Sequence, residues 1–214
     1  MTLPLLKILG HEIATSNWST DSKRVFWAAC CVAFFGSFRM GEILADNENS
    51  YSTETLTWDC VNLSVPKTAT IQVRFPKSNS KNTSDFIDLF AIQNSPLCPH
   101  ACLLNLRDKK SLFVSQNKPV FTFDSGLYLS TKRFNCTIRE LMHKHLGKTS
   151  GNISGHSFRA GIPAAISNHP DLMSNDDVCK WGRWNSNSFK LYTRLKLSAR
   201  KAIFGKLLSA INLE

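Results

Sequence analysis

The chain has 214 residues, enough to bury one hydrophobic core, and its 43% hydrophobic and 20% charged residues are ordinary values for a globular domain. No apolar run is long enough to cross a bilayer, so a membrane-spanning class is excluded, as is a mainly disordered one. A formal charge of +10 and a pI near 9.4 make a nucleic acid the candidate partner.

The cysteines point to a reducing compartment inside a cell. There are seven, an odd number, and several lie in apolar stretches, which is unlike a secreted disulfide scaffold. Cys98, His100 and Cys102 have close spacing, but no second pair offers the fourth ligand of a tetrahedral zinc. We therefore expect no metal and no other cofactor.

The first predicted element is a buried helix from Ser19 to Phe35, which opens on capping residues and continues through an apolar run from Val25. Two glycines then break the run, and Arg39 and Glu42 follow with a spacing of three residues. This spacing places both side chains on one face of a helical turn, where an ion pair would fix the guanidinium.

A change to β-branched alternation after Thr55 predicts a small antiparallel sheet. Its three strands are Leu56–Trp58, Thr70–Phe75 and Phe86–Leu89, separated by polar or proline-containing turns. The turn between the last two strands carries Lys77 and Lys81.

From Pro99 onward the pattern is helical again. The predicted helices cover residues 99–108, 131–146, 157–168, 175–181 and 199–211. The sequence therefore predicts an α+β fold that is mainly helical, with residues 1–214 forming a single domain.

Three short motifs carry the chemistry of the chain. They are Arg39-Met-Gly-Glu42, Gly155-His-Ser-Phe-Arg159, and the run from Gly182-Arg-Trp184 to Tyr192. Their order and spacing resemble the catalytic domain of the tyrosine recombinase (phage integrase) family. The form of the second and third motifs is most similar to the eukaryotic transposon recombinases of the DIRS-type and crypton kinds.

The resemblance implies a role for each matched residue. Arg39 and Arg159 would stabilise the charge of a phosphodiester under attack, as forked guanidiniums do without a metal. Tyr192 would be the nucleophile, and His156 would handle its proton. Glu42 would support Arg39 structurally.

Two positions of the family pattern stay open. The lysine that protonates the leaving 5′-oxygen should lie in the turn after the second strand, where Lys77 and Lys81 are the candidates. The family's second His or Trp lies nine residues before the tyrosine, where this sequence has Arg183, whereas Trp184 is eight residues before it. Either residue would supply a hydrogen bond to the phosphate.

The resemblance also implies partners. The chain would act on double-stranded DNA as a homo-oligomer, from dimer to tetramer, with residues 196–214 as a helix that docks into a neighbouring subunit. By the same resemblance, we expect that the family's N-terminal core-binding domain is absent from this chain. We also expect that a transposable element encodes the protein and that it acts in the nucleus. The further residues that we expect to contact DNA are Arg74, Lys81, Lys132, Arg133, Lys190 and Arg194.

The predicted function is therefore site-specific DNA recombination or integration through a 3′-phosphotyrosyl intermediate, without metal or ATP. Two alternatives remain at this stage. One is a type IB topoisomerase, which shares the chemistry but relaxes supercoils. The other is a domesticated DNA-binding module that has kept the fold and lost turnover.

Overall fold

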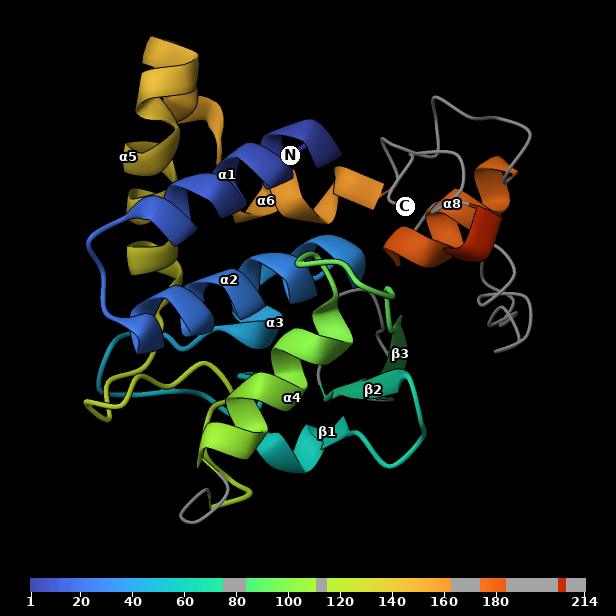
Figure 1. Cartoon of the computed structure of the whole chain (residues 1–214). Coiled ribbons are helices and arrows are strands. Elements are labelled where there is room, and N and C mark those ends of the chain that lie inside the picture. Colours follow the sequence, from blue (N-terminus) through green and yellow to red (C-terminus); the bar gives the residue numbers. More distant parts are fainter. Residues whose placement is uncertain (75–83, 111–114, 163–173, 184–203, 207–214) are drawn as a thin grey trace.

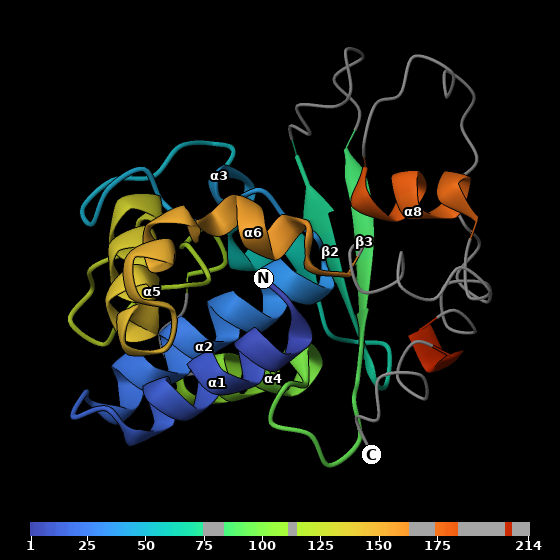
Figure 2. The same ribbon diagram turned by 90° about the horizontal axis from the view of Figure 1, so that it is seen from above.

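The computed structural model describes residues 1–74, 84–110, 115–162, 174–183 and 204–206. Other helices surround helix α2, and a small sheet lies at one side of this helical cluster (Figure 1). In Figure 2, α3 lies on the upper side of the molecule and α1 and α4 on the lower side, with α2 between them. The predicted class, mainly helical with one small antiparallel sheet, is confirmed.

Helix α2 (Thr20–Phe35) is the buried helix that the sequence predicts. The Ser19 hydroxyl accepts a hydrogen bond from the backbone N–H of Ser22 at 3.1 Å and so caps the helix. From Val25 onward almost every side chain of α2 is buried, because α1, α4 and α6 all pack against it. It is followed by the short helix α3 (Met40–Ile43).

Helix α1 (Leu3–Thr15) precedes it and was not predicted. The Thr2 side chain caps its start, and a proline follows at the position where helices tolerate one. Leu6, Leu9 and Ile13 lie on one face of α1 and are buried against the core.

The sheet has the order β1-β2-β3, with both neighbouring pairs antiparallel. Its strands are β1 (Val61–Asn62), β2 (Thr68–Val73) and β3 (Asp85–Phe90), and Ile71 of β2 pairs with Ile87 of β3. The strand predicted over Leu56–Trp58 is wrong, because Trp58–Cys60 forms a 3₁₀ turn, η1, and the first strand begins at Val61.

Three of the remaining helices follow the prediction closely, and the others do not. The remaining helices are α4 (Pro99–Lys110), α5 (Thr131–Leu146), the 3₁₀ segment η2 (Gly147–Asn152), α6 (Gly155–Arg159) and α8 (Asn175–Gly182). Helix α6 starts two residues before the predicted boundary and ends at Arg159, so the single helix predicted over 157–168 is wrong at Ala160, which lies in a turn. Residues 163–168 of that prediction lie outside the described residues. No helix within the described ranges has the length and apolar character needed to cross a lipid bilayer.

A row of aromatic rings joins α2, α5 and α6 in the core. Phe134 of α5 stacks on Phe26 at 5.6 Å between ring centroids and meets the edge of Phe158 of α6 at 5.3 Å. Phe204 is also buried, against Phe35 and Phe90 of the same chain. Of the predicted C-terminal helix, residues 204–206 are described and are helical.

An ion-pair cluster joins α1 to α5. The buried Glu12 carboxylate pairs with Lys144 and with His145, whose Nε2 lies 3.0 Å from Oε1. Hydrogen bonds from Lys144 and His145 lower the pKa of Glu12, with burial acting against them. A lowered pKa in the folded state stabilises the fold above the unfolded pKa, and this contribution is lost as the pH falls through the folded value.

We predict that Glu12→Gln lowers the melting temperature at neutral pH, because the variant keeps the shape of the side chain but loses its charge. The difference from wild type should shrink when the pH falls below the pKa of Glu12, where the wild-type carboxyl is protonated as well. Thermal unfolding followed by circular dichroism at pH 7 and at acid pH measures this. An equal difference at both pH values would contradict the prediction.

Candidate active site

The first motif forms a tight turn in which Glu42 closes on Arg39. Arg39 lies at the N-terminal cap of α3, and its backbone N–H donates to Glu42 Oε2 at 2.8 Å. Its guanidinium Nη1 donates to the other carboxylate oxygen, Oε1, at 3.0 Å. Glu42 therefore fixes the guanidinium of Arg39, as the sequence predicts, and also its backbone, while 32% of the Arg39 side chain stays exposed.

Arg159 and Arg183 come from distant parts of the chain to the turn that holds Ser37 and Glu42. Arg183 Nη2 donates to Glu42 Oε2 at 2.8 Å and to the Ser37 carbonyl at 3.1 Å. Arg159 Nη1 donates to the same Ser37 carbonyl at 2.8 Å, and its Nη2 donates to the Arg183 carbonyl at 3.1 Å. Arg39 and Arg159 are thus gathered at one turn, on either side of Arg183, as the sequence hypothesis requires of the two arginines.

The charges of this cluster change the pKa values of Glu42 and Arg159. Burial alone would raise the pKa of Glu42, but the charge and hydrogen bond of Arg183, with the backbone N–H of Arg39 and the charge of Arg159, lower it. Burial, followed by the charges of Arg183 and Arg39, lowers the pKa of Arg159 to about 10. Arg159 is therefore still protonated at neutral pH, and the cluster carries an excess of positive charge suited to a phosphate.

The second motif lies in α6, which approaches α3 closely because it begins with glycine. A Cβ atom built at Gly155 would lie 1.9 Å from Met40 Cγ, which no real contact allows. The Gly155 N–H donates to Asn135 Oδ1 of α5 at 2.8 Å and so fixes the start of α6. His156 follows immediately and is exposed to solvent, whereas Arg159 is buried at the end of the helix.

Three basic residues predicted to contact DNA lie outside this cluster. Arg74 pairs with Asp59, and Arg133 lies over the Phe123 ring at 4.5 Å with Nη1 3.5 Å from Glu48. Lys132 is exposed on α5. The part-exposed arginines at positions 74 and 133 are thus held by surface ion pairs, which a phosphate can compete for.

Several predicted site residues lie outside the described residues. They are Lys77, Lys81, Trp184, Lys190, Tyr192 and Arg194. Their roles stay predictions. In the described part of the chain there is no group of three or more His, Cys, Asp or Glu side chains that could hold a metal ion.

Sequence reasoning missed two parts of the site. The first is the carbonyl of Ser37, a backbone atom that no side-chain pattern identifies. The second is Phe38, whose ring lies beneath the Arg183 guanidinium at 5.2 Å. Phe38 follows the residue with the shared carbonyl and precedes Arg39. A large apolar side chain at this position was the sequence signal for a packed platform, and the ring is buried in the structure.

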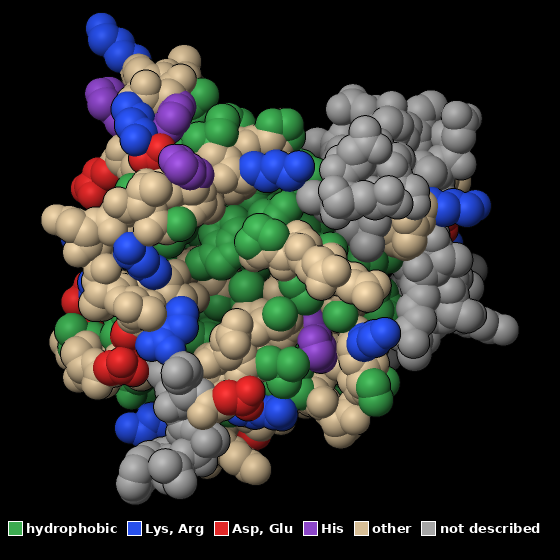
Figure 3. Space-filling view, viewed as in Figure 1, with side chains coloured by type: hydrophobic (Ala, Val, Ile, Leu, Met, Phe, Trp, Pro, Cys, Tyr) green, Lys and Arg blue, Asp and Glu red, His purple; other side chains and the backbone are tan. Residues whose placement is uncertain are grey.

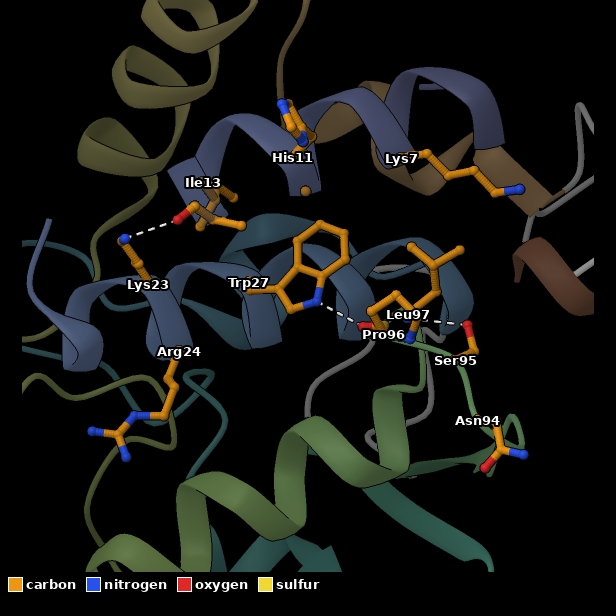
Figure 4. A pocket seen from close by; sticks show the side chains of 12 residues that line it. Lys7, His11, Ile13, Lys23, Arg24, Trp27, Asn94, Ser95, Pro96 and Leu97 are labelled. Atoms are coloured by element: carbon orange, nitrogen blue, oxygen red, sulfur yellow. Dashed lines mark hydrogen bonds between the residues drawn. The ribbon is translucent and has the colours of Figure 1, made fainter. Parts of the chain in front are cut away.

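A cavity lies elsewhere, between α1, α2 and the loop before α4 (Figure 4). It has a volume of about 720 Å³, and Trp27 lies along it with its indole N–H donating to the Pro96 carbonyl at 2.7 Å. Figure 3 shows apolar surface at the centre of this face, with lysine and arginine side chains around it. In Figure 2 this face is the lower side, away from α3, so the cavity is separate from the arginine cluster.

Comparison with known proteins identifies the fold. No protein-family model and no curated protein matches this sequence. Among solved structures, the chain is similar to the XerH site-specific recombinase bound to its difH substrate, with a TM-score of 0.59 and 14% identity over 94% of this chain and 52% of that one.

Two further structures agree. XerA recombinase has a TM-score of 0.55 and 18% identity, with 96% of this chain and 62% of that chain covered. FLP recombinase in a Holliday junction complex has a TM-score of 0.51 and 14% identity, with 92% and 45% covered. The chain therefore has the fold of a tyrosine recombinase catalytic domain, and it spans between 45% and 62% of the length of these three proteins.

Proposed function

We propose that this chain is the catalytic domain of a site-specific DNA recombinase that cuts and rejoins DNA through Tyr192. The observation that carries the proposal is the gathering of Arg39 and Arg159, 120 positions apart in the sequence, around Arg183. Arg39 binds the Glu42 carboxylate, Arg159 binds the Ser37 carbonyl, and Arg183 binds both of these acceptors. The similarity of the fold to recombinases supports it independently.

In the proposed reaction the Tyr192 phenol oxygen attacks the scissile phosphorus. A new bond from phosphorus to the tyrosine oxygen forms as the bond to the 5′-oxygen breaks, so the number of phosphodiester bonds is conserved. His156 accepts the phenol proton, and Lys77 or Lys81 gives a proton to the leaving oxygen. Arg39 and Arg159 stabilise the charge of the phosphorane-like transition state, and ligation is the same sequence in reverse.

The proposal extends to the setting of the reaction. We propose double-stranded DNA as the substrate, a homo-oligomer as the active form, and a transposable element in a nucleus as the source of the sites. Residues 196–214 would form a helix that docks into the neighbouring subunit. Because binding would rest largely on phosphate contacts by basic residues, affinity for DNA should fall steeply with salt.

We predict that Tyr192→Phe abolishes covalent attachment to DNA, because phenylalanine has no oxygen to attack phosphorus. The assay uses a pool of 5′-labelled duplexes with randomised half-sites, each with a nick just beyond the cleavage position. After cleavage, the short fragment with the free 5′-hydroxyl diffuses away, and the labelled strand stays attached to the protein. Denaturing electrophoresis then separates protein-linked strands from free ones. Retention of the native DNA-binding affinity by the variant controls for its folding.

Three results would contradict the proposal. An adduct in the Phe variant would assign the nucleophile to another residue. Relaxation of supercoiled plasmid without strand exchange between two sites would indicate a type IB topoisomerase. DNA binding by the wild type with no adduct from any sequence in the pool would indicate a module that has lost turnover.

A further inference from the structure

Arg183 occupies a position that joins the two other arginines of the cluster. It follows the last residue of α8 with a φ of +53°, a left-handed conformation that usually requires glycine at the end of a helix. Its side chain is only 8% exposed. A strained backbone and a buried charge at one residue indicate that its exact placement matters to the site.

The contacts of Arg183 run in two directions. Its side chain holds Glu42, and the same carboxylate holds Arg39 through the backbone N–H and Nη1. Its backbone carbonyl accepts from Arg159 Nη2 at 3.1 Å, and both arginines donate to the Ser37 carbonyl. An unbroken series of hydrogen bonds therefore runs from Arg39 through Glu42 and Arg183 to Arg159.

From this geometry we propose that Arg183 is a positioning residue, which sets the separation of Arg39 and Arg159 through Glu42 and through its own carbonyl and does not itself bind the scissile phosphate. The proposal rests on the proposed recombinase function and names how its phosphate site is assembled. It also assigns the family's second His or Trp position in this chain a role other than that of a phosphate donor.

Two observations favour positioning over phosphate binding. The Arg183 guanidinium already faces a carboxylate at 2.8 Å, and a phosphate in the same place would meet the negative charge of Glu42. Its Nε and Nη1 are buried and have no hydrogen-bond partner among the described residues, and the guanidinium lies over the Phe38 ring. The Phe38 ring partly compensates these buried nitrogens for the missing partners.

The test is a double-mutant cycle of Arg183→Met and Glu42→Gln, measured as the rate of adduct formation with a nicked duplex selected from the randomised pool. Arg183→Met keeps the length of the side chain and loses its charge and hydrogen bonds. We expect the cleavage rate of this variant to fall about 100-fold, because a shift of about 1 Å in a catalytic group has this effect. The dissociation constant for the duplex should stay close to that of the wild type.

The cycle separates the two roles. If Arg183 acts through Glu42, the double variant should cut no more slowly than the worse single variant, because either change already breaks the same series of bonds. If Arg183 binds phosphate directly, the two losses should multiply, and this result would overturn the inference. Arg183→Lys retains the charge beside Glu42 and should recover part of the cleavage rate.

Failure of this inference can be told apart from failure of the function. A wild type that forms the adduct, together with an Arg183→Met variant that cuts equally fast, would overturn the positioning role alone. A wild type that forms no adduct would overturn the recombinase proposal and the inference with it. If Arg183→Met is too unstable to bind DNA, the cycle is run with Arg183→Lys, for which the same non-additivity is expected.

Discussion

Replacing Glu42 with glutamine should be among the most damaging single substitutions in the chain, lowering the free energy of unfolding by about 3 kcal/mol. The Glu42 side chain is 3% exposed and faces Arg39 and Arg183, with Arg159 nearby, so its charge balances several guanidiniums in a buried place. A neutral amide would leave those charges without compensation. Chemical denaturation at pH 7 measures the effect.

Glu48→Gln is the matched control for this substitution. Glu48 also pairs with an arginine, but its side chain is 42% exposed and lies 3.5 Å from Arg133. The expected loss is below about 1 kcal/mol, because solvent screens exposed ion pairs. Similar losses in the two variants would show that burial of Glu42 contributes little.

The effect of Glu42→Gln should depend on pH in a defined direction. Because the folded state lowers the pKa of Glu42, its charge stabilises the fold above the unfolded pKa, and this contribution disappears as the pH falls through the folded value. The variant and the wild type should therefore become more similar in stability in acid.

Gly155→Ala should separate the two motif-bearing helices and reduce cleavage about 100-fold, since α6 carries both His156 and Arg159. The new methyl group would collide with Met40 Cγ at 1.9 Å and with Met40 Cβ at 3.1 Å, so rotation of the end of that side chain does not relieve the contact. A loss of about 1–3 kcal/mol in stability is expected from overpacking of this kind. Adduct formation and thermal unfolding measure the two effects.

Gly41→Ala provides the control within the opposite helix. Gly41 lies between Met40 and Glu42, and a Cβ atom there has nothing within 4 Å. Alanine should leave cleavage unchanged and raise the stability by about 0.4–1 kcal/mol, because it restricts the unfolded chain. A comparable loss of cleavage in both variants would mean that the two motifs tolerate no substitution at all, whatever the space.

The long amphipathic and buried helices were predictable because their local signals agree with their packing. The predicted range of α5, 131–146, is confirmed at both ends, and α2 begins one residue after the Ser19 cap. The signals for α1 were also present, namely the Thr2 cap and the apolar spacing of Leu6, Leu9 and Ile13. No element was predicted before Ser19, although these signals favour a helix there.

The first strand was wrong for a physical reason. Leu56 and Trp58 alternate with polar residues and are buried, but their backbone pairs with residues 116–120 and not with β2. Trp58 donates to the Lys118 carbonyl at 3.2 Å, and Val120 donates to the Leu56 carbonyl at 3.0 Å. Alternation reports which face is buried, but it does not identify the partner strand.

The site was predictable as far as it rests on ordered motifs. The ion pair of Arg39 and Glu42 follows from motif spacing, and the placement of Arg159 on the turn before Arg39 follows from the family resemblance. The placement of Arg183 on Glu42 did not follow, because it depends on a contact between residues 141 positions apart. Only the three-dimensional packing of α3 against the end of α8 reveals it.

The Ser37 carbonyl has a consequence for how such sites tolerate change. Two guanidiniums are anchored on a peptide oxygen, which every amino acid carries, while the Ser37 hydroxyl is buried without a hydrogen-bond partner among the described residues. Position 37 therefore requires a residue that adopts a φ of +49°, and it does not require a particular side-chain group. Glycine or asparagine at position 37 would therefore keep the carbonyl in place for both guanidiniums. Variation of the residue type at this position is compatible with the proposed activity.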